Sequence, residues 1–167
     1  MIYTVVDDDG LMSIVNADKY NGFVDNDWEL QQLLDHFVNE TNARNIIVWK
    51  CNDGGGEWKV AVLKHPSEKN EFRHFSFPLV VTNGCLYLVS YADLTMAAQF
   101  EDQTIPAKHN ADLKIDLANG SYIVLVRQMF DPNIFDYEED IIHFEIVFNL
   151  VDTTDGQKAD EVFWWDE

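Results

Sequence analysis

The sequence predicts a mainly β (α+β) fold, an antiparallel β-sandwich with one packed amphipathic helix. Three observations support this. Several short runs rich in Val, Ile and aromatic residues are separated by turns that contain glycine. Only residues 27–40 repeat their apolar side chains convincingly at helical spacing. Finally, 167 residues that are 47% hydrophobic and 13% aromatic are enough for one domain with a sizeable core.

The first elements follow from local pattern. Residues 2–6 predict a strand that ends at an Asp-Asp-Asp-Gly turn, and residues 10–15 are its candidate hairpin partner. In the helix over residues 27–40, Asn26 or Asp27 is placed to cap the amino end. Five residues form its apolar face: Leu30, Leu33, Leu34, Phe37 and Val38.

Glycine turns divide the middle of the chain into three predicted hairpins. They join residues 45–50 to 57–63, 72–81 to 85–92, and 111–117 to 121–130. The strand over 121–130 is apolar on both faces, so we expect it to lie inside a sheet.

The last predicted strand, residues 141–151, alternates in polarity. Its apolar set is Ile142, Phe144, Ile146, Phe148 and Leu150, and its polar set is His143, Glu145 and Asn149. Such alternation is typical of a strand with one solvated face, so we expect His143 and Glu145 to be exposed.

These elements predict a single domain over residues 1–167. Residues 1–70 supply a front module of helix and hairpin, and residues 71–167 supply the sandwich hairpins and an acidic carboxyl-terminal tail.

The charge is unusually negative. Thirty Asp and Glu residues against eleven Lys and Arg give a net charge of −19, which should repel nucleic acid and anionic membranes and attract a basic protein. The excess lies in residues 1–42 and 131–167, while residues 43–130 are balanced. Since the ends of a domain often lie close together, we expect one acidic face. The alternative is an evenly solvated surface that only aids solubility.

No catalytic or metal-binding motif is present. From Asp131 the spacing of an EF-hand loop fails, because Phe135 and Asp136 stand where a ligand and a glycine are needed. The five histidines lack the HxH and HExxH spacings of zinc sites. We therefore predict no enzyme, no cofactor and no metal. Two alternatives stay open, a carboxylate-based hydrolase that uses the acidic residues between Glu138 and Glu145, and a calcium-dependent ligand-binding sandwich.

The cellular location is predicted to be cytoplasmic. The first residues lack a basic segment followed by an apolar one, and no apolar run approaches the roughly 18 residues that span a bilayer. Cys51 and Cys85 are far apart in sequence, which favours two reduced thiols over a disulfide.

Acidic and aromatic residues near the carboxyl end form the candidate partner-binding site. Three successive aromatics, residues 163–165, cannot all point inward from a strand, so at least one should be partly exposed. The alternative is that Phe163 and Trp165 pack into the core as an edge strand. The candidate contacts are Asp136, Glu138, Glu139, Asp140, Glu145, Trp164 and Trp165.

Residues 77–128 resemble the small bacterial inhibitors of the competence DNA-entry nuclease. The matched positions are Pro78, Gly84, Leu117, Gly120 and Tyr122, which mark strands and their turns. The chain departs from that pattern by its helix over 27–40 and its acidic aromatic tail. The resemblance implies a nuclease-binding or immunity role and transfers no functional residue. Together with the charge, it predicts an acidic non-catalytic immunity protein or inhibitor that binds a basic nuclease or toxin.

Overall fold

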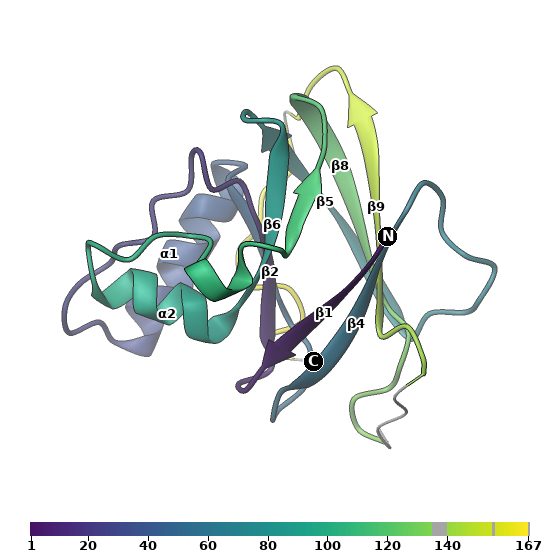
Figure 1. The fold of residues 1–167 in the computed structure, drawn as a ribbon, viewed down its shortest axis with the longest axis horizontal. Helices are drawn as coiled ribbons and strands as arrows, with labels where there is room; N and C mark the ends of the chain where they lie inside the picture. Colours follow the sequence, from purple (N-terminus) through teal and green to yellow (C-terminus); the bar gives the residue numbers. More distant parts are fainter. Residues whose placement is uncertain (135–139, 155, 167) are drawn as a thin grey trace.

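The computed structural model describes residues 1–134, 140–154 and 156–166 as two packed sheets and two helices (Figure 1). The five-stranded sheet contains, in spatial order, β1 (Ile2–Asp7), β4 (Gly56–Leu63), β9 (Phe144–Val151), β8 (Gly120–Gln128) and β5 (Arg73–Val81). The four-stranded sheet contains β3 (Ile46–Lys50), β2 (Leu11–Val15), β6 (Cys85–Ser90) and β7 (Lys114–Asp116). The helices are α1 (Leu30–Asn42) and α2 (Tyr91–Gln99), with a 3-10 turn, η1, at Lys108–Asn110.

The molecule has three layers. Apolar side chains from both sheets, among them Trp49, Trp58 and Phe144, fill the space between the sheets. A second apolar cluster joins the outer face of the four-stranded sheet to helices α1 and α2 through Leu33, Phe37 and neighbouring residues. The predicted mainly β sandwich is therefore confirmed, and strand β8 lies inside its sheet as expected.

The strand pairings differ from the predicted hairpins. In each of the three predicted pairs, the two strands belong to different sheets: β3 and β4, β5 and β6, and β7 and β8. Strands β1 and β2 are divided in the same way. The reason is that a glycine turn reverses the chain equally well within a sheet or across the gap of about 10 Å between two sheets. Strands β4 and β9 also pair in parallel, so the sandwich is not wholly antiparallel.

The helices correct two further predictions. Helix α1 begins at Leu30, three residues later than predicted, because Glu29 and Gln32 form a capping box in place of a cap at Asn26 or Asp27. Helix α2 was not predicted. Its buried residues include two alanines, so it lacks the wide apolar stripe by which α1 is recognised.

The polar residues at the start of the predicted strand 141–151 are buried rather than solvated, while at its other end Asn149 is exposed as expected and Leu150, predicted on the apolar side, is 69% exposed. His143 is 0% exposed and Glu145 is 3% exposed, which contradicts the prediction for both residues. Residues 64–72, the connection between β4 and β5, supply polar partners for Glu145 and its neighbour Arg127. Arg127 of β8 is 5% exposed, forms an ion pair with Glu145, and donates to the main-chain oxygens of Ser67 and Lys69. This connection covers Glu145, whereas His143 packs edge-on against the rings of Trp58 and Phe130.

No helix within the described part of the chain is both long and apolar enough to cross a membrane.

Candidate functional site: an acidic surface around Trp165

The segment over residues 159–166 is fixed against the edge of β3 and the end of α1. The Asn42 side chain donates to the Ala159 carbonyl oxygen at 2.8 Å and accepts from the Ala159 amide at 2.8 Å. Phe163 then forms a parallel bridge with Trp49, in which its carbonyl accepts from the Lys50 amide at 2.9 Å. The tail therefore closes the outer edge of the four-stranded sheet.

The three successive aromatics point in different directions. Phe163 stacks on Phe75 with ring centroids 4.0 Å apart. Trp164 has a φ of +62° and is 7% exposed, with the Arg73 guanidinium 4.4 Å above its ring. Trp165 remains partly exposed, which agrees with the expectation that at least one aromatic reaches the surface. Trp164 is a correction, because packing on Phe75 and Arg73 leaves little of it for a partner.

Trp165 separates two adjoining grooves of about 260 and 250 Å³. One lies between the β1–β2 turn, the end of β3 and Tyr91 at the start of α2, and the other lies between α1 and the tail. We call this region the Trp165 surface. It comprises Asp9, Leu30, Asp35, Lys50, Asp53, Asp160, Glu161, Trp165 and Asp166.

Charge from the two ends of the sequence meets on the Trp165 surface. Asp9 and Asp35 come from the acidic first block, and Asp160, Glu161 and Asp166 come from the acidic last block. All five residues are exposed. This part of the expected acidic face is therefore present in the structure, with apolar side chains such as Leu30 and Leu34 beside the carboxylates.

Lys50 is the basic residue of the Trp165 surface. Its Nζ lies 2.6 Å from Asp53 Oδ1 and 5.8 Å from the centroid of the Trp165 ring. The hydrogen bond from Lys50 lowers the pKa of Asp53, so this carboxylate is ionised at neutral pH. The surface thus combines an aromatic ring, apolar side chains and a surplus of carboxylates, the combination expected of a contact for a cationic protein.

Two of the other predicted contacts, Asp140 and Glu145, lie away from the Trp165 surface. Asp136, Glu138 and Glu139 fall outside the described residues. Asp140 is fully exposed and lies 3.9 Å from Lys59 Nζ on strand β4. Glu145 is buried beneath residues 64–72, and its carboxylate forms an ion pair with Arg127.

The predicted contacts included none of the carboxylates of the Trp165 surface, which are Asp9, Asp35, Asp53, Asp160, Glu161 and Asp166. The last three flank the aromatic residues 163–165 in sequence, whereas nothing among the thirty acidic residues marks the first three. One usable signal was the helix itself, since Leu30, Leu34 and Val38 continue its apolar stripe beyond the buried Leu33 and Phe37.

The described residues hold no group of three or more His, Cys, Asp or Glu side chains arranged for a metal ion. Cys51 and Cys85 are both buried and unbridged, so the prediction of two reduced thiols is confirmed. Burial raises the pKa of the Cys51 thiol, which makes it a poor nucleophile at neutral pH.

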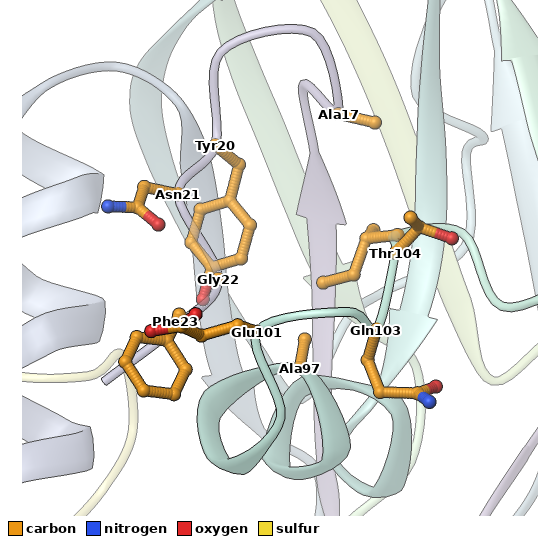
Figure 2. Close-up of a pocket in the computed structure, with 10 residues that line it drawn as sticks. Ala17, Tyr20, Asn21, Gly22, Phe23, Ala97, Glu101, Gln103 and Thr104 are labelled. Atoms are coloured by element: carbon orange, nitrogen blue, oxygen red, sulfur yellow. The ribbon is translucent and has the colours of Figure 1, made fainter. Parts of the chain in front are cut away.

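A separate cavity of about 290 Å³ lies between residues 17–23 and helix α2 with the loop that follows it (Figure 2). Tyr20 lines one wall, and its hydroxyl is buried with no hydrogen-bond partner among the described residues. Ala97 and Gln103 line the opposite side, and the carboxylate in the lining is that of Glu101. No His, Lys, Arg or Cys side chain is among the described residues that line this cavity.

Comparison with known proteins supports the fold assignment. No protein-family model matches the chain, and no curated protein sequence matches it. Two solved structures are similar over most of their length. The product of crocagin biosynthetic gene J has a TM-score of 0.58 and 11% identity, covering 89% of this chain and 96% of its own. ComJ of Bacillus subtilis, an inhibitor of the DNA-degrading activity of NucA, has a TM-score of 0.50 and 12% identity, covering 90% and 96%.

The chain shares its fold with these two proteins. The resemblance that residues 77–128 suggested is thereby confirmed, and it extends far beyond those residues. At 12% identity the similarity to ComJ establishes the fold alone.

Proposed function

We propose that this protein is an acidic inhibitor that binds a basic nuclease through the Trp165 surface. The single observation that carries the proposal is the position of Trp165, partly exposed between two grooves where carboxylates from both ends of the chain meet. The fold shared with ComJ, an inhibitor of a DNA-degrading activity, supports a nuclease as the partner.

Electrostatics supplies the mechanism. A nuclease holds DNA phosphates with Lys and Arg side chains, and the carboxylates of Asp160, Glu161 and Asp166 would take the positions of those phosphates. The net charge of −19 would attract a cationic partner from a distance and raise its association rate. Trp165 would then supply the buried area that slows dissociation. Asp140 and residues 136–139 are candidates for further contacts.

A hydrolase that uses Glu145 is not favoured. The ion pair with Arg127 and the hydrogen bond from the Ser67 amide at 3.2 Å occupy this carboxylate. We therefore infer a binding role without catalysis. The unbridged thiols of Cys51 and Cys85 support a cytoplasmic location.

The direct test is inhibition of DNA degradation. The purified protein is titrated into NucA of Bacillus subtilis, and into any basic nuclease that it captures at low ionic strength from a lysate of its own source. We expect stoichiometric loss of DNA cleavage by the cognate nuclease, with an association rate that falls steeply as salt rises. Unchanged cleavage by every such nuclease in the presence of excess protein would contradict the proposal.

We expect Trp165→Ala to weaken binding of the captured nuclease by roughly 2 kcal/mol or more, since a central aromatic is a common hot spot. Phe100→Ala is the matched control, because Phe100 is 41% exposed and does not line either groove. Affinity is measured by calorimetry. Equal losses in the two variants would place the contact elsewhere.

Removing negative charge should change the association rate, whereas removing the Trp165 ring should mainly change the dissociation rate. We expect the double change Asp160→Asn and Glu161→Gln to lower the association rate severalfold at low salt and to have little effect at high salt. Asp152→Asn, at an exposed site directly after β9, serves as the control. Rates come from stopped-flow fluorescence, and a change confined to the dissociation rate would argue against steering.

A further inference from the structure

Strand β1 forms an outer edge of the five-stranded sheet and pairs with β4 alone among the described strands (Figure 1). The Met1 amino group donates to the Val62 carbonyl at 3.1 Å, and the Val62 amide donates to the Met1 carbonyl at 2.8 Å. Hydrogen-bonded pairs alternate along an antiparallel ladder. From this register, the amides and carbonyls of Ile2, Thr4 and Val6 point away from β4.

The side chains at these three positions are also accessible. Ile2 and Val6 are 62% and 63% exposed, and Thr4 is exposed between them. Natural edge strands are usually protected by charge, proline, a bulge or a covering loop. Residues 2–6 contain no charged residue, no proline and no glycine. Within the described part of the chain, this edge therefore has both unpaired backbone groups and exposed apolar side chains.

We propose that β1 pairs antiparallel with β1 of a second copy of this chain, with the two-fold axis at Thr4. This register places Ile2 of each copy opposite Val6 of the other and brings the two Thr4 residues together. All three outward-facing residues are then hydrogen-bonded across the axis. The five-stranded sheets of the two copies become one continuous sheet.

A second copy fits this edge better than the cationic partner proposed above. Ile2, Thr4 and Val6 carry no charge, so they provide no complement to basic side chains. Their order reads the same from either direction, apolar, threonine, apolar, and this matches itself. The inference does not depend on nuclease binding.

The dimer should be weak and should strengthen with salt. A six-residue strand offers far less than the about 800 Å² per partner of a standard stable interface. Each copy also carries a net charge of −19, and the repulsion between copies decreases as the Debye length shortens. Nuclease binding is expected to weaken as salt rises, which is the opposite dependence. One experiment can therefore contradict the dimer without contradicting nuclease binding, and the reverse.

Sedimentation velocity of the purified full chain tests this pairing. Between about 0.05 M and 0.5 M NaCl we expect the dissociation constant of the dimer to fall. Thr4→Pro removes an outward-facing amide and leaves the β1–β4 hydrogen bonds intact, so it should raise that constant at least about tenfold. Thr4→Val keeps the backbone and should dimerise like the wild-type protein. A monomer at every salt concentration, or a dimer unaffected by Thr4→Pro, would overturn the proposal.

A cross-link tests the register. Facing residues of a hydrogen-bonded antiparallel pair have Cα atoms about 5.5 Å apart, within the range of a disulfide. Thr4→Cys should therefore form a covalent dimer under mild oxidation at least about tenfold faster than Leu150→Cys, whose side chain is 69% exposed on the interior strand β9. Cys51 and Cys85 are buried and should not interfere. Equal rates of cross-linking would contradict pairing at Thr4.

Discussion

An Arg127→Met variant is expected to unfold with a free energy about 3–5 kcal/mol below that of the wild-type protein, because it leaves a buried carboxylate without its cation. The Arg127 and Glu145 side chains are 6% and 4% exposed. Arg127 also binds Glu71 Oε2 at 2.7 Å and donates to the main-chain oxygens of Ser67 and Lys69. The same change should therefore loosen residues 64–72 from the sheet.

Urea denaturation followed by fluorescence measures this effect, and hydrogen exchange of residues 64–72 reports the local loosening. Lys69→Met is the control, because its side chain is exposed while its carbonyl oxygen remains available to Arg127. The double variant Arg127→Met, Glu145→Leu should recover much of the lost stability, since it removes both charges together. If Arg127→Met alone cost less than about 1 kcal/mol, the ion pair would not be a main support of this face.

Acidification should destabilise the protein through His143. This side chain is 0% exposed, and burial, assisted by Lys59, lowers its pKa from 6.5 to about 4. Its Nδ1 accepts a hydrogen bond from the Lys59 amide at 2.9 Å, so the neutral ring carries its proton on Nε2. The folded state thus favours the uncharged ring.

The direction follows from proton binding. Below pH 6.5 His143 becomes protonated in the unfolded chain but stays neutral in the folded protein. The free energy of unfolding therefore decreases as the pH is lowered, until the folded pKa of about 4 is reached. The loss amounts to about 2 kcal/mol at pH 5 and about 3 kcal/mol below pH 4.

His143→Asn isolates this term, because an Asn oxygen can accept from the Lys59 amide but cannot titrate. When the pH is lowered from 7 to 5, we expect the free energy of unfolding of this variant to decrease by about 2 kcal/mol less than that of the wild-type protein. His65→Asn removes an exposed histidine and should keep the wild-type slope. If the free energies of unfolding of the His143 variant and the wild-type protein changed equally with pH, the pKa of His143 would be the same in the folded and unfolded states, and the prediction would be wrong.

The sequence was sufficient to predict where the strands lie in the chain, but not which strands pair with each other. Alternation and glycine turns located the strands from residues 45–50 to residues 141–151, because both signals are local. Pairing depends on which sheet a strand joins, and both sheets turn one apolar face towards the same core. The four-stranded sheet also buries its other face against the helices, so β2 is buried throughout while β1 alternates, but neither pattern shows which strand lies beside it.

The candidate site was predictable to a similar degree. Three aromatics in a row predicted that at least one ring is partly exposed, but this pattern favoured Trp164 and Trp165 alike and did not distinguish between them. Asp9 and Asp35 join Trp165 only after α1 and the tail pack together, and no local pattern encodes that contact. Glu145 was misplaced because a connection more than seventy residues away in sequence covers it.

The position of β9 has a consequence for how the chain reaches its native state. Strand β9 lies between β4 and β8, so without it the larger sheet consists of two separate ribbons, β1 with β4 and β5 with β8. Neither ribbon is joined to the other until residues 144–151 are available. Assembly therefore depends on contacts between distant parts of the sequence, which is the condition for slow folding. During synthesis the unjoined edges of β4 and β8 would be exposed to aggregation until the last strand emerges.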